Sequence, residues 1–358
     1  GCAGGVDITA ENPYNEVHAP SNTYGCSIAV TGLNGGHSGM DIHKGLGNAN
    51  KIMNRLLFDG FENFGLQVAE INGGSLRNAI PRESVAKIIV AKMYDEAYVF
   101  DMQEIINDIK NEYKTTEPNL VIEITKSELP SKVMDLGVQE GIIRSIYAAH
   151  NGVYRMSADM KDLVETSNNV ARIIIKEGEI TIGCLTRSSV ETSKFDLANS
   201  LRSVFELCGC EVTLAGSYPG WTPNVNSEIL DVLVSVYEKQ NNEKPKVVAC
   251  HAGLECGILG SHFPNMDMIS FGPNIRAPHS PDEKVQISEQ FDKCDTVEDA
   301  EKLYKSIVNE HKIKVNKNPE KSIKSTSIKS TPAKSVSQPL YESREVSRMK
   351  QLAGIKEK

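Results

Sequence analysis

The stretch NNVARIIIKEGEITIGCLTRSS, residues 168–189, contains two runs rich in β-branched and apolar residues on either side of Lys-Glu-Gly. Such runs are typical of β-strands, so we expect two consecutive strands here. A helical spacing precedes them around residues 139–149, and another follows over DLANSLRSVFELCG, residues 196–209. A last strand is expected over EVTLAGSY, residues 211–218. The segment therefore predicts strands that alternate with helices.

The same order of elements occurs earlier in the chain. Ile52, Met53, Leu56 and Leu57 lie at helical spacing in GLGNANKIMNRLLFDGF. Two β-α-β-β-α-β units side by side predict one broad antiparallel sheet with helices on one face. The elements expected in this first unit are a strand over 23–33, a helix over 45–61, strands over 65–74 and 83–93, a helix over 101–114 and a strand over 119–129.

The pattern changes at YPGWTPN, residues 218–224, which is rich in turn residues. An amphipathic helix is expected over 227–240, and KVVAC (246–250) and MDMISFG (266–272) are short apolar runs of the kind found in parallel sheets. These few elements are too small for an independent core, so we expect them to complete a larger α/β layer. Residues 312–358 are of low complexity, and we expect a mostly disordered basic tail.

Composition narrows the class of protein. The 358 residues suggest about two domains. No apolar stretch reaches the roughly 18 residues that a membrane span needs, and the first residues lack the features of a signal peptide. Residues 312–358 hold 12 Lys and Arg against 4 Glu, which leaves 27 basic and 43 acidic residues in the rest of the chain. So acidic a body argues against binding to nucleic acid.

Eight cysteines show neither a CxxC pair nor the spacing of a small disulfide-rich domain. We therefore expect reduced and mostly buried thiols. Cys208 and Cys210 are compatible with a redox pair, but packing in the core is the favoured interpretation.

Three glycine-rich clusters are candidates for chemistry: GLNGGHSGMDI around His37, HAGLECG around Gly253 and GPNIRAPHSPDE around His279. Glycines permit close approach of a ligand to the main chain, and two prolines fix the loop of His279. A single histidine, however, is usually a satisfied core or surface residue, and zinc needs three or four ligands. The histidine spacings match no zinc motif, so spacing alone indicates only a possible hydrolase.

Longer motifs carry a resemblance to a known family. The chain resembles the cytosol non-specific dipeptidases, also called aminoacyl-histidine dipeptidases, which are related to aminoacylase, carnosinase and glutamate carboxypeptidases. The resemblance extends to about residue 311. The motifs, in chain order, are GGHSGMDIHKGLGNANK, NGGSLRNAIPRE, the Arg of LTRSSVETSK, YPGWTPN, HAGLECG and MDMISFGPNIRAPHSPDE.

The resemblance implies roles for five residues. His279 matches a metal ligand, and His37 matches the histidine that stabilises the oxyanion of the tetrahedral intermediate. Asn78 and Arg187 match residues that hold the peptide and its terminal carboxylate, and Gly253 matches a backbone position close to the substrate. The family also implies two divalent metal ions, zinc foremost and otherwise cobalt or manganese, a dipeptide substrate, a homodimer formed through a lid domain and a cytoplasmic location.

The resemblance also divides the chain. We expect residues 1–21 to end the first half of a zinc-peptidase catalytic domain, 22–218 to form the lid, 219–311 to form the second half and 312–358 to be the tail. The family's other metal ligands and its Glu base precede the segment that GCAGG matches, so we expect a chain that begins within a longer protein and is inactive alone. Two alternatives are a non-catalytic relative that dimerises or binds peptides, and a related aminoacylase or tripeptidase.

Overall fold

The computed structural model describes residues 1–272, 274–276 and 284–286. Contacts divide the chain into two compact units, residues 1–271 and 272–358. In the second unit, β14 (Asn274–Arg276) and β15 (Lys284–Gln286) pair antiparallel. The tail expected over residues 312–358 and the proposed ligand His279 lie outside the described residues.

The first unit is built on a nine-stranded sheet in which every pair of neighbours is antiparallel. Its order is β13-β1-β12-β11-β5-β7-β3-β8, and β10 pairs with β11 outside this path. The broad antiparallel sheet expected from the sequence is therefore confirmed. Its strands are β1 (Gly4–Pro13), β3 (Thr23–Thr31), β5 (Gln67–Gly73), β7 (Ser84–Ala91), β8 (Val121–Ser127), β10 (Gly152–Met156), β11 (Val164–Lys176), β12 (Glu179–Ser188) and β13 (Glu211–Tyr218).

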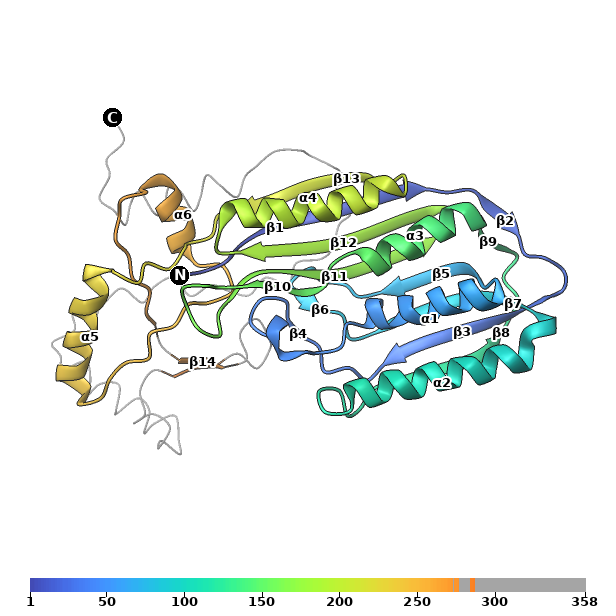
Figure 1. The fold of residues 1–358 in the computed structure, drawn as a ribbon, viewed down its shortest axis with the longest axis horizontal. Coiled ribbons are helices and arrows are strands. Elements are labelled where there is room, and N and C mark those ends of the chain that lie inside the picture. The colour runs from blue at the N-terminus through green and yellow to red at the C-terminus, as the bar shows by residue number, and fades with distance from the viewer. Residues whose placement is uncertain (273, 277–283, 287–358) are drawn as a thin grey trace, which may run out of the picture. The chain divides into compact units, whose positions relative to one another are not determined.

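Four helices lie side by side on one face of this sheet in the order α4, α3, α1, α2 (Figure 1). The apolar side chains between sheet and helices form the main core. The helices are α1 (Ala49–Phe64), α2 (Asp95–Tyr113), α3 (Leu136–Ala148) and α4 (Glu191–Leu207), with α5 (Glu228–Asn241) and α6 (Glu255–His262) later in the chain. The short elements are β2 (Glu16–His18) paired with β9 (Lys132–Met134), β4 (Gly36–His37) paired with β6 (Ala79–Ile80), and the 3-10 turns η1 (Ile42–Lys44) and η2 (Lys92–Tyr94).

Helix α1 shows why the sequence folds in this way locally. The Asn48 side chain accepts hydrogen bonds from the backbone N–H groups of Asn50 and Lys51, which satisfies the free donors of the first turn. Ile52 and Leu56, one turn apart, are at most 1% exposed. Gly65 ends the helix with a φ of 61°, a conformation that glycine adopts without steric cost. The helical spacing seen in the sequence therefore corresponds to the buried face of α1.

Two parts of the structure differ from the sequence-based expectations. Residues 4–13, which we assigned to the catalytic part, form β1 and pair with β12 and β13 inside the main sheet. Residues 246–250 and 266–272, expected as parallel strands, form no strand. Only Cys250 makes a bridge, and it is a parallel bridge to Cys2. A buried parallel strand needs neighbours on both sides, whereas Val248 is 76% exposed.

The loop that carries His37 is fixed to the core by Glu117. The Glu117 side chain is only 2% exposed. Its two carboxylate oxygens accept hydrogen bonds from the backbone N–H of Asn34 at 2.7 Å and of Gly47 at 2.8 Å. Because these residues lie on either side of the loop, one buried carboxylate holds both of its ends.

We predict that Glu117→Gln lowers the free energy of unfolding by about 1–3 kcal/mol, because the amide turns an NH₂ group toward one of the two backbone N–H donors. Urea unfolding of the full chain measures the difference. Glu112→Gln is the matched control, since Glu112 forms an exposed ion pair with Arg55 and such pairs contribute less than about 1 kcal/mol. An equal loss of unfolding free energy in the two variants would contradict this role of Glu117.

Candidate functional site

The pairing of two short strands brings the His37 and Asn78 motifs together. In β4 and β6, Gly36 lies opposite Ile80 and His37 opposite Ala79. The next backbone N–H, that of Ser38, donates to the carbonyl oxygen of Asn78 at 2.8 Å. Asn78 thus supports the loop through its main chain, while the residue itself is exposed.

The His37 ring is held in one tautomer by its own loop. Its Nδ1 accepts hydrogen bonds from the backbone N–H groups of Gly39 and Met40, both at 3.1 Å. A ring nitrogen that accepts two N–H donors carries no proton, so the proton of the neutral ring lies on Nε2. The loop therefore fixes His37 as an Nε2–H donor.

Asp41 closes the other side of this loop. Its Oδ2 accepts the backbone N–H of His37 at 2.7 Å, and its Oδ1 pairs with Lys44 at 2.6 Å. Burial alone would raise the pKa of Asp41, but the hydrogen bonds from Lys44 and from the His37 backbone outweigh it, so the pKa lies below its ordinary value. The carboxylate is consequently ionised at neutral pH and keeps the turn closed.

Arg187 lies in β12, where the sheet register places it between Gly5 of β1 and Ser167 of β11. The residue is 4% exposed. Its Nη1 donates to the Tyr218 hydroxyl at 2.8 Å, and its Nε donates to the Ser38 hydroxyl at 3.3 Å. The guanidinium therefore joins the end of β13 to the His37 loop.

The HAGLECG motif packs against the same residues. A side chain on Gly39 would overlap the carbonyl oxygen of His251, so the His37 loop can lie this close only because residue 39 is glycine. Gly253 lies against the edge of the Tyr218 ring: a Cβ atom added to Gly253 would lie 3.1 Å from the ring's Cε2. Both contacts bring residues 251–253 to the Arg187 side chain and its partners.

His251 is buried and neutral. Its Nε2 lies 2.8 Å from the hydroxyl of Ser167, and the two residues are 6% and 1% exposed. Burial, followed by the nearby Arg187 charge, lowers the pKa of His251 to about 3. The imidazole thus acts as a neutral hydrogen-bonding partner of Ser167 at physiological pH.

These contacts define what we call the Arg187 cluster. Of the residues expected from the sequence, it includes His37, Arg187 and Gly253, and it includes Asn78 only through its backbone. Four further residues were given no role from the sequence, although three of them lie within the motifs quoted above, because their contacts join positions that are far apart in the chain. They are Ser38, Ser167, Tyr218 and His251.

The described residues do not fit a metal centre. They contain no group of three or more His, Cys, Asp or Glu side chains that could hold a metal ion. The proposed ligand His279 is not among them.

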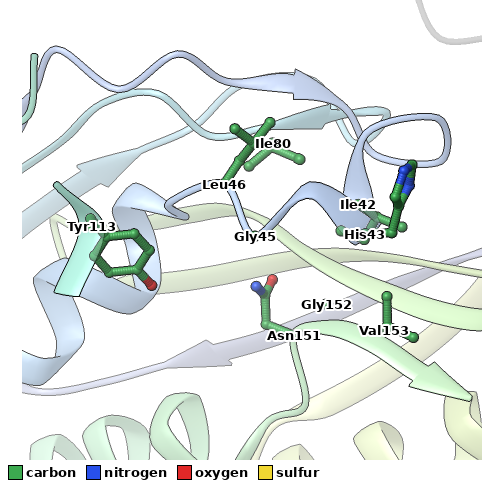
Figure 2. Close-up of a pocket in the computed structure, with 9 residues that line it drawn as sticks. All are labelled: Ile42, His43, Gly45, Leu46, Ile80, Tyr113, Asn151, Gly152 and Val153. Carbon is green, nitrogen blue, oxygen red and sulfur yellow. The ribbon is translucent and has the colours of Figure 1, made fainter. Parts of the chain in front are cut away.

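A separate cavity of about 330 Å³ lies next to the loop that follows His37 (Figure 2). A second one, of about 260 Å³, shares Leu46, Tyr113 and Asn151 with it. No residue that lines either cavity belongs to the Arg187 cluster, so these cavities are separate from the candidate site. The lining residues of the first cavity are Ile42, His43, Gly45, Leu46, Ile80, Tyr113, Asn151, Gly152 and Val153.

Comparison with known proteins shows which proteins the chain is similar to. Residues 28–117 match the family model of the peptidase dimerisation domain. The chain is 38% identical over 291 residues to the cytosol non-specific dipeptidase of Escherichia coli (strain K12). This match covers 80% of this chain and 59% of that protein. The crystal structure of aminoacylhistidine dipeptidase from Vibrio alginolyticus is 38% identical, with a TM-score of 0.75 over 79% of this chain and 58% of that one.

The resemblance to the dipeptidases that the motifs indicated is thereby confirmed. The chain spans less than two thirds of the length of both relatives.

None of the described helices is long and apolar enough to cross a membrane.

We predict that His251 makes the protein less stable in acid. Its folded pKa of about 3 lies below the ordinary value of 6.5, so its contribution is complete above pH 6.5 and is lost as the pH falls toward 3. The free energy of unfolding should therefore fall by at most about 1.4 kcal/mol for each pH unit. Urea unfolding at pH 7, 6 and 5 measures it. His251→Gln should make the free energy of unfolding less dependent on pH, whereas the control His262→Gln, at an exposed histidine, should not. An unchanged pH dependence in His251→Gln would rule the explanation out.

Proposed function

We propose that this chain is the substrate-holding part of a metal-dependent dipeptidase that hydrolyses Xaa-His and other dipeptides in the cytoplasm. The observation that carries the proposal is the buried guanidinium of Arg187. The names of the two relatives support the reaction class. Arg187 is assigned to the C-terminal carboxylate of the peptide, and Asn78 and Gly253 are assigned to the peptide chain.

The surroundings of Arg187 suit an anionic ligand. Among the described residues its hydrogen-bond acceptors are two neutral hydroxyls. The Asp7 carboxylate is near enough to interact with the Arg187 charge, but its ion pair is with Arg77. A buried guanidinium without a direct ion-pair partner is costly, and a ligand carboxylate would supply that partner. The planar guanidinium can offer two parallel N–H donors to such a carboxylate. A dipeptide, which ends in a carboxylate, is a ligand of this kind.

His37 is the candidate for stabilising the oxyanion. The Gly39 and Met40 N–H groups fix the proton of its neutral ring on Nε2. An N–H donor held in place before the reaction stabilises negative charge that develops on the scissile carbonyl oxygen. Ser38, the next residue, accepts from Arg187 at 3.3 Å. The two proposed contacts with the peptide are therefore linked through one hydroxyl.

The relatives' class indicates dependence on divalent metal ions, with zinc proposed first and cobalt or manganese next. Since the described residues offer no such site, we assign no catalytic step to a metal here. His279 is proposed as one ligand. The remaining ligands and the general base are proposed to lie outside the 358 residues.

We further propose that the chain forms a homodimer through the sheet and helices of residues 28–117, which match the dimerisation domain. Helix α2 within this range exposes Val99 and Phe100, at 50% and 65%. Exposed apolar side chains of this size suit a protein interface. Sedimentation of the full chain as a monomer would exclude the dimer.

The test of the carboxylate site is a comparison of two ligands and two variants. We predict that the chain binds alanyl-histidine at least about tenfold more tightly than the C-terminal amide of the same dipeptide. Arg187→Lys should remove this preference, because an ammonium cannot make the bidentate contact. Arg172→Lys, on the exposed side of β11, is the matched control. Isothermal titration calorimetry gives the affinities, and equal binding of acid and amide contradicts the role of Arg187.

We also predict that the 358-residue chain hydrolyses no Xaa-His dipeptide when zinc, cobalt or manganese is added. Release of free histidine is the measurement. Detectable turnover would show that the ligands and base are present after all. If the chain lengthened to the span of its relatives were equally inactive but still bound dipeptides, the non-catalytic alternative would replace the enzyme. Preference for acylated amino acids or tripeptides would favour the aminoacylase or tripeptidase alternative.

A further inference from the structure

Cys208 and Cys210 meet at the turn between α4 and β13. Their sulfur atoms are 3.7 Å apart and within hydrogen-bonding distance of each other. Gly209, between them, has a φ of 89°, which L side chains rarely adopt. The N–H groups of Cys208 and Cys210 both donate to the carbonyl oxygen of Phe205, at 3.3 and 3.1 Å. The turn is therefore fixed with both thiols on the same side.

This pair differs from the other cysteines. Seven free cysteines lie among the described residues, and only these two are hydrogen-bonded to each other. The packing in the core that the sequence favoured accounts for Cys210, which is 5% exposed. Cys208 also packs against this core, but it is partly exposed and lies beside an exposed Gly209. Cys208 is therefore the more accessible residue of the pair.

The environment makes the two thiols unequal. The hydrogen bond from Cys210 lowers the pKa of Cys208, and the same bond raises the pKa of Cys210. The carbonyl oxygen of Phe205, 3.1 Å from the Cys208 sulfur, and the C-terminal end of α4 act against ionisation of Cys208. The neighbouring thiol first, and then the Ser145 hydroxyl, therefore favour ionisation of Cys208, whereas the helix does not.

We propose that Cys208-Gly209-Cys210 is a redox-active dithiol that small-molecule disulfides oxidise to an intramolecular disulfide. The accessible thiol is the attacking group and the shielded thiol is the resolving group. This site is independent of the Arg187 cluster and of the proposed dipeptidase activity.

The reaction balances in two exchanges. The Cys208 thiolate attacks one sulfur of a disulfide RSSR, which forms a mixed disulfide and releases RS⁻, which takes up a proton. Cys210 then loses its proton to solvent, and its sulfur attacks the Cys208 sulfur and expels the second RS⁻. The dithiol loses two electrons and two protons, and RSSR becomes two RSH. The sulfur atoms must approach from 3.7 Å to about 2.0 Å, which the freedom of Gly209 permits.

The second exchange leaves a short ring of three residues. Such a ring departs from unstrained disulfide geometry, and strained disulfides are reduced easily. Cys208 also lies over Gly141 of α3, where a built Cβ would come 3.2 Å from the Cys208 Cβ. We therefore expect the oxidised form to be reversible and to alter the contact between α3 and α4.

The test treats the reduced full chain with glutathione disulfide and maps its peptides by mass spectrometry. In the unmodified protein the peptide with both cysteines should lose two hydrogens and keep no glutathione, and dithiothreitol should restore it. Cys210→Ala should stop at a glutathione adduct on Cys208. Cys208→Ser should leave Cys210 unmodified. Cys256→Ser, at a partly exposed cysteine with no sulfur partner among the described residues, should react like the unmodified protein.

Two results would overturn the proposal: a stable glutathione adduct on Cys208 in the unmodified protein, or reaction of Cys210 in Cys208→Ser. Thermal unfolding of each variant shows whether it is folded. Phenylarsine oxide, which bridges two adjacent thiols, provides a second measurement on the unmodified chain alone. If the reagent protects both cysteines of this peptide from alkylation, the result supports the proposal. If both cysteines are still alkylated, the result counts against the proposed proximity of the thiols.

Discussion

The site depends first on the register of three strands. Arg187 is buried because β12 pairs with β1 on one side and with β11 on the other, so that Gly5 and Ser167 flank it. Side chains alternate between the two faces of a strand, and a shift by one residue would turn Arg187 to the opposite face. The contacts of Arg187 with Ser38 and Tyr218 require the same register. The geometry that holds the proposed ligand is thus set by the backbone pairing of the sheet.

Local pattern predicted most of the elements but not their partners. The spacing of Ile52 and Leu56 identified α1, because helix periodicity is visible within one window of sequence. The place of β1 in the sheet depends on pairing with strands about 170 and 200 residues later, so no local pattern indicates it. Residues 246–250 were expected as a strand from composition, but a single bridge at Cys250 is their only pairing.

The same limit applies to the site. His37, Arg187 and Gly253 were identified by resemblance, and the structure brings them together. Tyr218 lies within the YPGWTPN motif, but neither it nor Ser167 could be given a role from the sequence, because their contacts with Arg187 and His251 join residues distant in the chain. The structure adds a physical reason for the neutral state of His251, namely burial beside Arg187. Two cations close together would repel each other, so a neutral imidazole keeps the guanidinium as the positive charge of that cluster.

The carboxylate of Glu117 makes the segment that bears His37 dependent on a distant helix. It joins Asn34 and Gly47 across 83 and 70 residues of sequence, next to the C-terminal end of α2. Closing loops of this length costs entropy that these two contacts help to offset. Local opening at the end of α2 would therefore release both ends of the segment. The order of the residues proposed to contact the substrate is thus coupled to the local stability of a helix that does not itself belong to the Arg187 cluster.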